Sequence, residues 1–224
     1  MNFEINPSTV HLPIFGGVDV DNTLLAMWIV MALLTVAALA LRIFVLPRFK
    51  ERPKGFQNVL ELVVETATKF TNDKVGARDG RILAPYFFTL AVLLFSCGLS
   101  ELIGLRNPLT DMNLTVALAV ISFLLINIFG IWRKGVWGRI KSLAKPNPIL
   151  LPIKVITDLA VPVSLACRLF GSMLGGYIIM EMITEFVPVL APAVLSLYFT
   201  FFHVGIQTFL FITLSLTFIE EATE

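Results

Sequence analysis

The chain has 224 residues, of which 57% are hydrophobic and only 15% are charged. Soluble domains average about 45–50% apolar and roughly 25% charged residues, so this composition is typical of a membrane protein. It excludes a disordered chain, a nucleic-acid-binding protein with a basic face and most soluble enzymes. Two cysteines exclude a disulfide scaffold. The net charge of +1 becomes informative only when the charged residues are placed along the chain.

Five apolar segments are long enough to cross a bilayer, whose hydrocarbon core is about 30 Å thick and requires about 20 apolar residues in a helix. The sequence predicts transmembrane helices over residues 24–46, 83–105, 114–132, 149–187 and 192–221. Pro188 and Pro192 separate the last two, because proline interrupts helical hydrogen bonding. Both are longer than a bilayer requires, so we expect a tilted hairpin of long helices.

Residues 55–73 have a different pattern from the spans. Apolar residues recur there at spacings of three and four, with Glu and Lys between them. This periodicity predicts an amphipathic helix on the membrane surface. A loop helix that packs on a partner protein is the alternative. The complete fold prediction is an all-α, polytopic integral membrane protein forming one membrane domain over residues 1–224, with five transmembrane helices and this surface helix.

The cations are concentrated in two loops. Of the 17 Lys and Arg residues, eight lie between residues 47 and 82 and five lie in the loop 133–148, whereas residues 1–23 have none. By the positive-inside rule both loops are cytoplasmic. We therefore expect an external N-terminal segment, 1–23, and a cytoplasmic C-terminus. The N-terminal segment lacks the charged region of a signal peptide, so the first apolar run is predicted to be a true span.

One cation, Arg168, lies at the midpoint of the predicted helix 149–187. An arginine at the bilayer centre costs about 2.5–3.5 kcal/mol on insertion scales, and it stays charged. It must therefore face water, a counter-charge or a cluster of carbonyls. A buried pair with a carboxylate of this chain is one possibility. A fixed charge that attracts and releases a mobile carboxylate is the functional alternative.

Small residues follow this arginine along the same helix. They are Gly171, Ser172, Gly175 and Gly176. Small residues spaced by four allow another helix to approach closely within lipid. The pattern predicts a smooth face for a neighbouring subunit beside a permanent cation, and packing within the chain is the alternative.

Polar residues occur at several membrane depths on both long helices. Those predicted to line an ion path are Asp158, Ser172, Tyr177, Glu181, Glu185, His203 and Gln207. Asp158 lies toward the cytoplasm, whereas the acids at 181 and 185 lie toward the outside. Such groups are costly in hydrocarbon unless they line water or pair with one another. The arrangement predicts two offset half-paths that meet at the arginine. The alternatives are that His203 is a buried core residue and that the acids at 220, 221 and 224 form a solvated tail.

Six short motifs in order resemble one known family. They are FQNVLELVVE (56–65), LAP (83–85), DMNLT (111–115), FGIWRKG (129–135), PVSLACRLFG (162–171) and QTFLFITL (207–214). Together they resemble subunit a of the F-type ATP synthase, the membrane stator that passes ions to the rotating c-ring. The match covers most of the chain.

This resemblance implies a role for particular residues. Arg168 is similar to the family's essential arginine, and Gln207 to a supporting polar residue. The chain departs from the pattern at Ser172, where Asn is usual, and at Tyr177 and Thr200, where many members carry acids or histidine. We expect the acid at 181 and the histidine at 203, each about one turn away, to replace those groups.

The resemblance also implies partners and a location. These are the c-ring, peripheral-stalk b subunits, membrane lipid and a transported H⁺ or Na⁺, with no cofactor, metal or nucleic acid. A bacterial cytoplasmic (inner) membrane is expected. The subunit would carry out no chemistry on its own chain, as part of a larger ATP synthase.

Other classes of function remain as alternatives. An ion-coupled secondary transporter could use the buried Arg168 to bind an anionic substrate, and it would take up solute without partners. An intramembrane enzyme is disfavoured, because the chain has no HExxH or GxSxG motif, and it also lacks the GxxxxGK[ST] nucleotide loop. A purely structural scaffold would not require polar groups at several depths.

Overall fold

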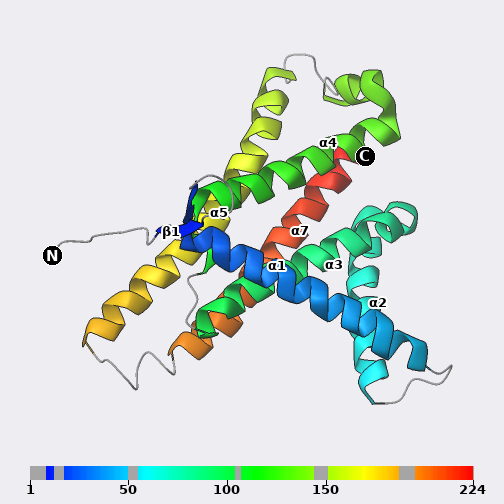
Figure 1. The fold of residues 1–224 in the computed structure, drawn as a ribbon. Coiled ribbons are helices and arrows are strands. Elements are labelled where there is room, and N and C mark those ends of the chain that lie inside the picture. Colours follow the sequence, from blue (N-terminus) through cyan, green and yellow to red (C-terminus); the bar gives the residue numbers. More distant parts are fainter. Residues whose placement is uncertain are drawn as a thin grey trace.

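Five long helices dominate the structure, a computed structural model that describes residues 9–12, 18–49, 55–103, 107–143, 151–186 and 195–223. Within those ranges, five helices are long and apolar enough to cross a membrane. They are Asn22–Val45, Ala77–Leu102, Met112–Gly135, Ile156–Glu185 and Leu195–Thr223. The predicted polytopic, helical membrane class is therefore confirmed (Figure 1).

The N-terminal region adds a feature that the sequence analysis does not predict. Two short strands, β1 (Thr9–Leu12) and β2 (Val18–Asp21), pair antiparallel, with Val10 opposite Val20. Helix α1 follows directly as Asn22–Ala40 and continues into a π-helical turn, Leu41–Val45. A 3₁₀ turn, Leu46–Arg48, ends this part of the chain. Strands of four residues are too short to show a clear alternating pattern in the sequence.

Helix α2 (Phe56–Val75) occupies the segment predicted to be amphipathic. It reverses into α3 (Ala77–Leu99) at Gly76, whose φ of +87° favours glycine. α2 packs against α3 and against α7 (Val204–Thr223), with the rings of Phe70 and Phe209 5.6 Å apart. Its C-terminal half is thus fixed by the bundle, whereas its position at a membrane surface stays a prediction.

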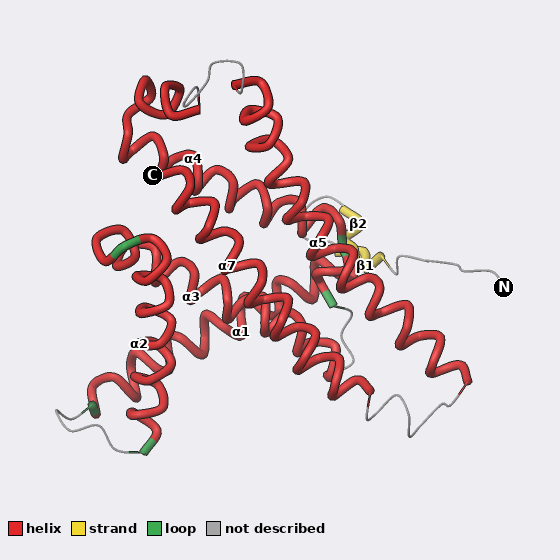
Figure 2. The backbone as a smooth tube through the Cα atoms, turned by 180° about the vertical axis from the view of Figure 1, so that it is seen from behind, coloured by secondary structure: helices red, strands yellow, loops and turns green. Residues whose placement is uncertain are grey.

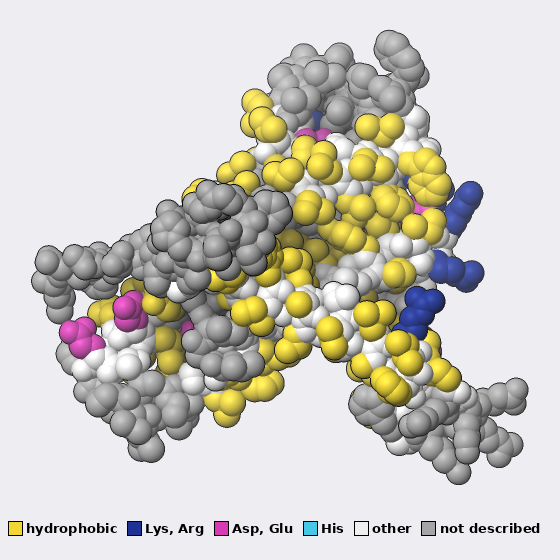
Figure 3. Space-filling model, in the orientation of Figure 1, with side chains coloured by type: hydrophobic (Ala, Val, Ile, Leu, Met, Phe, Trp, Pro, Cys, Tyr) yellow, Lys and Arg dark blue, Asp and Glu magenta, His cyan; other side chains and the backbone are white. Residues whose placement is uncertain are grey.

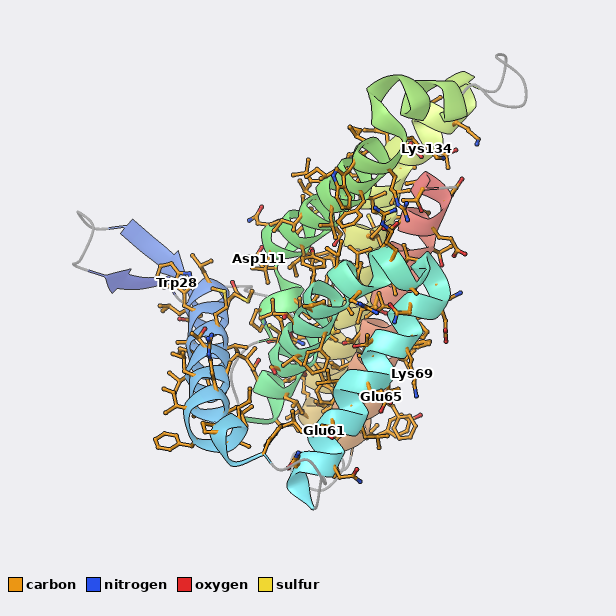
Figure 4. All side chains as sticks on the ribbon, turned by 90° about the vertical axis from the view of Figure 1, so that its right-hand side faces the viewer. Trp28, Glu61, Glu65, Lys69, Asp111 and Lys134 are labelled. Atoms are coloured by element: carbon orange, nitrogen blue, oxygen red, sulfur yellow. The ribbon has the colours of Figure 1, made fainter. Side chains whose placement is uncertain are left out.

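The polar side of α2 points away from the bundle, as the labelled Glu61, Glu65 and Lys69 show in Figure 4. The Lys69 ammonium lies 2.8 Å from a Glu65 carboxylate oxygen. This hydrogen bond and the opposite charges lower the pKa of Glu65 and raise that of Lys69. Both side chains are exposed, so the pair contributes little to stability.

Helix α3 begins at Ala77, six residues before the apolar run expected at 83, because its first turns are polar and hydropathy does not detect them. It ends in a 3₁₀ segment, Ser100–Ile103, and a second 3₁₀ turn, Pro108–Thr110, follows. The next residue, Asp111, accepts a hydrogen bond from the Asn113 N–H at 2.9 Å. This aspartate, in the DMNLT motif, therefore caps the following helix.

Helix α4 (Met112–Leu143) is longer than the predicted span 114–132. It bends at Gly135, where φ is +71°, and remains helical through much of the segment expected to be a basic loop, 133–148. A glycine at positive φ tolerates such a bend, because it has no Cβ to clash with the backbone.

The last two helices are long and run in opposite directions (Figures 1 and 2). α5 (Leu151–Phe186) has 36 residues, or about 54 Å at 1.5 Å per residue. The last helix begins at Leu195 and contains a π-helical segment, Phe199–His203, before α7. α5 exceeds the hydrocarbon core of about 30 Å, so it must tilt or extend beyond it.

The core lies where α3, α4, α5 and α7 meet. Its largest fully buried side chains include Leu83, Leu94, Leu109, Leu165, Leu169, Phe211, Leu216 and Ile219. Much apolar surface remains outside this core. Hydrophobic side chains cover a broad band of the surface in Figure 3, with a group of Lys and Arg at one edge and with Asp and Glu at the opposite end, near the top and beside the Lys and Arg group. An apolar band between charged ends is expected for a protein that crosses a membrane.

Candidate functional site

Arg168 lies at the middle of α5 and is partly exposed. Among the residues that the structure describes, no hydrogen bond or ion pair involves its guanidinium. A structural pair with a carboxylate of this chain, one reading of the sequence, is therefore not seen in the described ranges. A guanidinium with five N–H donors at membrane depth requires acceptors. The geometry leaves it open to water or to a group of another molecule.

The glycines beside Arg168 form an open face. Apart from the backbone of its own helix, a Cβ atom added at Gly171 or Gly175 would meet no atom of the described residues within 4 Å. By contrast, a Cβ at Gly98 of α3 would lie less than 3 Å from three carbons of Val204. Packing among the described residues thus accounts for a glycine at position 98 but not at positions 171 and 175. Small residues on the α5 face suit the close approach of a helix from another chain.

His203 joins the two long helices one turn from Arg168. Its Nε2 lies 3.0 Å from the backbone oxygen of Ser172 on α5. Because a carbonyl only accepts, this contact requires Nε2 to carry the proton and donate it. His203 ends the π-helical segment Phe199–His203, and π-helical turns occur frequently at functional sites. The Ser172 hydroxyl donates to the Leu169 oxygen at 3.1 Å, so the serine is held within its own helix.

A pocket of about 360 Å³ brings several predicted residues together at one end of the bundle. It is lined by Glu101, Tyr177, Met180, Glu181, Thr184 and Glu185. We name it the carboxylate pocket. The described residues that line it include three carboxylates and no lysine or arginine. Tyr177, Glu181 and Glu185 therefore share one space, as expected for groups along a polar path.

Glu101 is a pocket residue that the sequence analysis does not select. It lies in the 3₁₀ segment after α3 and is partly buried. Its side chain lines the carboxylate pocket together with residues of α5. An acid close to the end of an apolar run suggests an interfacial residue, and only the packing of the bundle reveals that it shares a pocket with Tyr177 and Glu181. The sequence has one feature that could have identified Glu101, namely an ionisable side chain within a predicted transmembrane helix.

Two further polar residues of the last helix are enclosed by the bundle. Gln207 is 5% exposed and Thr200 is 3% exposed. Within the described part of the chain, the Gln207 Nε2 has no hydrogen-bond partner. Most buried side-chain donors have a partner, so this amide is available to a water molecule or a transient group.

The opposite end of the bundle has a different polar pocket, of about 540 Å³. It is lined by Asp73, Lys74, Val75, Gly76, Asp79, Arg133, Lys134, Glu220 and Thr223. The Arg133 Nε donates to a carboxylate oxygen of Asp79 at 2.5 Å, and the Asp79 side chain is only 3% exposed. Glu220 of the C-terminal segment thus lines a pocket instead of extending as a free tail. Asp158, partly exposed on α5, is not among the described residues that line it.

Comparisons with known proteins identify the family. The family described as ATP synthase A chain matches residues 24–220. The ATP synthase subunit a of Moorella thermoacetica is 34% identical over 206 residues, covering 91% of both chains. The ATP synthase subunit a 2 of a Picosynechococcus species is 30% identical and covers 98% of this chain and 93% of its own length. The subunit a of Nitrosospira multiformis is also 30% identical, with coverages of 98% and 86%.

These matches extend across all five spanning helices and include the segment around Arg168. The fold is multi-pass, and the family implies a complex with other Fo subunits. The chain belongs to the ATP synthase A chain family, the membrane stator subunits of the Fo sector.

Proposed function

We propose that this subunit forms two offset aqueous half-channels that load and unload a carboxylate of the c-ring, with Arg168 between them. The observation that carries the proposal is the partly exposed guanidinium at the middle of α5, with no partner among the described residues. The open glycine face beside it supports close approach of a c-ring helix.

The outer half-channel uses the carboxylate pocket. An ion enters past Glu181 and Glu185, continues past Tyr177 and reaches His203 and Ser172, one turn from the arginine. The ion then neutralises the c-ring carboxylate. A neutral side chain can rotate into lipid, whereas a charged one cannot do so without a large cost.

The inner half-channel lies on the other side of Arg168 and passes Asp158, with Gln207 as a supporting polar group near the arginine. The guanidinium favours the ionised carboxylate by opposite-charge attraction, so the ion leaves when that carboxylate arrives. Because arginine stays charged, it also blocks a direct leak of cations between the two paths. Each charge that crosses 100 mV supplies about 2.3 kcal/mol.

The residues that replace the family pattern belong to the same proposal. Tyr177 and Thr200 stand where many members carry acids or histidine, and Glu181 and His203 lie about one turn away. The position of Glu181 in the pocket and the contact of His203 with Ser172 support this exchange.

The orientation follows from the distribution of charge. The pocket with Lys74, Arg133 and Lys134 belongs at the cytoplasmic face, and the carboxylate pocket at the outer face. The N-terminus is then outside and the C-terminus inside, in a bacterial inner membrane. The c-ring and the peripheral-stalk b subunits are the protein partners, and H⁺ or Na⁺ is the transported ion.

The experiment is ATP-driven ion pumping in inverted vesicles that contain the complete synthase. Arg168→Ala should abolish pumping, because the charge that separates the two half-channels is lost. The c-ring should still co-purify with subunit a, because the fold of the subunit is retained. Glu61→Gln, on the exposed side of α2, is the matched control and should pump normally. Retained pumping by Arg168→Ala in an assembled complex would overturn the proposal.

A further inference from the structure

Residues 107–111, which we name the α3–α4 turn, are held by hydrogen bonds of their own. The Asn107 side-chain oxygen accepts the Leu109 N–H at 3.0 Å, and the Asn107 backbone oxygen accepts the Thr110 hydroxyl at 2.8 Å. Asn107 is 1% exposed and Leu109 is fully buried. Because a carboxamide is planar, the bond to its oxygen also fixes the direction in which its NH₂ group points. The turn is therefore a rigid piece of the fold, although it lies between two helices.

The α3–α4 turn is attached to three helices. Its last residue, Asp111, caps α4 and also accepts a hydrogen bond from the Thr23 hydroxyl of α1 at 3.4 Å (Figure 4). Its first residue, Asn107, donates from Nδ2 to the Met173 sulfur of α5 at 3.7 Å. A thioether is a weak acceptor, so this contact acts mainly through its direction. The turn thus connects α5 to a framework formed by α1 and α4.

Met173 is the last buried residue of α5. A stripe of buried side chains, spaced by four, runs along this helix: Val161, Leu165, Leu169 and Met173. Among the described side chains that follow it, at 174–185, none is buried. α5 therefore leaves the core beyond Met173, and the contact with Asn107 lies where the core last holds this helix.

The Met173 side of α5 is opposite to the glycine face. Successive residues turn by about 100° around a helix, so residues two positions apart are about 200° apart. Gly171 precedes Met173 by two positions and Gly175 follows it by two, so both point away from the buried stripe. A rotation of α5 that moved Met173 off the turn would move the glycine face by the same angle. The direction of the open face thus depends on what holds Met173.

We propose that Asn107 is a positioning residue that fixes the rotation of α5, and so aims Arg168 and the glycine face at the c-ring. This inference rests on the proposed function, because it concerns the face that meets the c-ring. Apolar side chains alone hold a helix without a preferred direction, since hydrophobic contact is non-directional. The Asn107 carboxamide, held by the Leu109 N–H, supplies that direction at Met173.

The rotation of α5 is measured by the distance between two spin labels in the assembled synthase. One label is attached at Met182→Cys, on α5 beyond the contact, and the other at Leu33→Cys on α1. Both side chains are at least half exposed. The native cysteines at 97 and 167 are replaced by serine. The unaltered turn should give one narrow distance distribution, because it links α1 to α5.

Three substitutions remove the contact in different ways. Asn107→Asp keeps the oxygen that accepts the Leu109 N–H but loses the NH₂ group, and Asn107→Leu loses both at similar volume. Met173→Leu removes the sulfur and conserves volume, a change that cores tolerate well, so the fold is kept. Each should broaden or shift the distance distribution. Asn58→Asp, at an exposed position of α2, is the matched control and should leave the distribution unchanged.

The double variant Asn107→Asp/Met173→Leu tests whether the two side chains act through each other. Its distribution should be no broader than that of Asn107→Asp alone, because both substitutions remove the same contact. A distribution broadened by the sum of the two single effects would show that the two residues act independently, and would overturn the inference.

ATP-driven pumping in vesicles is the functional readout. Asn107→Asp should lower it at least about tenfold, since a misplacement of about 1 Å far from the reacting groups can cost about 10²-fold in rate. Asn58→Asp should pump normally. If Asn107→Asp lowers the melting temperature but leaves the label distance and pumping unchanged, Asn107 is only structural and the inference is wrong. A shifted distance with normal pumping would also overturn it.

Arg168→Ala separates this inference from the proposed function. If the Asn107 variants keep the normal label distance and pump normally while Arg168→Ala does not pump, the positioning role is wrong and the half-channel proposal stands. Retained pumping by Arg168→Ala would instead overturn the half-channel proposal itself.

Discussion

Helices α3 and α5 both cross the bundle. Both ends of α3 pack against neighbouring helices, whereas the middle of α5 has a face that the described residues leave uncovered. α3 is attached at both ends, by the Asp79–Arg133 ion pair to α4 and by the Gly98–Val204 contact to the last helix. The middle of α5 has a charged residue with no partner in the described ranges and two glycines, 171 and 175, with empty space above them.

This difference indicates which helix face is available to a neighbouring chain, namely the face of α5. In lipid, a small residue is useful where a backbone approaches closely. At Gly98 the group that approaches closely is the Val204 side chain of the same chain. At Gly171 nothing in the described part of the chain uses the space, and under the proposed function the approaching helix is that of another subunit. Variants at the two sites should therefore affect different properties.

The largest effect on stability is expected at the charged end of α3. Arg133→Ala leaves the buried Asp79 carboxylate without its partner, and breaking a buried pair in this way costs about 3–5 kcal/mol. The Arg133 side chain is 37% exposed, so the lower end of that range is expected. Thermal unfolding of the detergent-purified complex measures the loss. Arg133→Lys should recover part of it, and an unchanged melting temperature for Arg133→Ala would show that α3 is not held by this pair.

A smaller loss is expected at the other end of α3. Gly98→Ala places a methyl group against Val204, which is 2% exposed and has a stiff, β-branched side chain. Overpacking of this kind costs about 1–3 kcal/mol. Adding Val204→Ala to the same chain should restore part of the stability by removing the clashing methyl groups. Equal melting temperatures for Gly98→Ala and the double variant would contradict the close contact.

The smallest effect on stability is expected on the open face. Gly171→Ala adds a methyl group that meets no described residue outside its own helix within 4 Å, and alanine in a helix interior is favoured over glycine by about 1 kcal/mol. Purified subunit a should therefore be unchanged or slightly stabilised. ATP-driven pumping should nevertheless fall, since the methyl group occupies space needed by the neighbouring helix. Reduced stability with normal pumping would reverse the interpretation of this face.

The sequence predicts the five spans because runs of about 20 apolar residues are decisive for a membrane protein. It does not predict the N-terminal hairpin, whose strands have four residues each, or the helical continuation of α4 beyond Gly135. Arg168 is selected by its depth alone. Glu101 is not, because the pocket that it shares with α5 forms only in the folded chain, and spacing along the sequence does not reveal it.

The central claim is that the α5 face around Arg168 meets the c-ring, and cross-linking tests it most directly. Gly171→Cys, in a chain with the native cysteines at 97 and 167 replaced by serine, is oxidised in assembled synthase that has a single cysteine beside the c-ring carboxylate. Leu33→Cys, on the exposed side of α1, is the control. We predict a disulfide-linked product with the c subunit for Gly171→Cys and none for Leu33→Cys. No product for Gly171→Cys in an assembled complex would contradict the account.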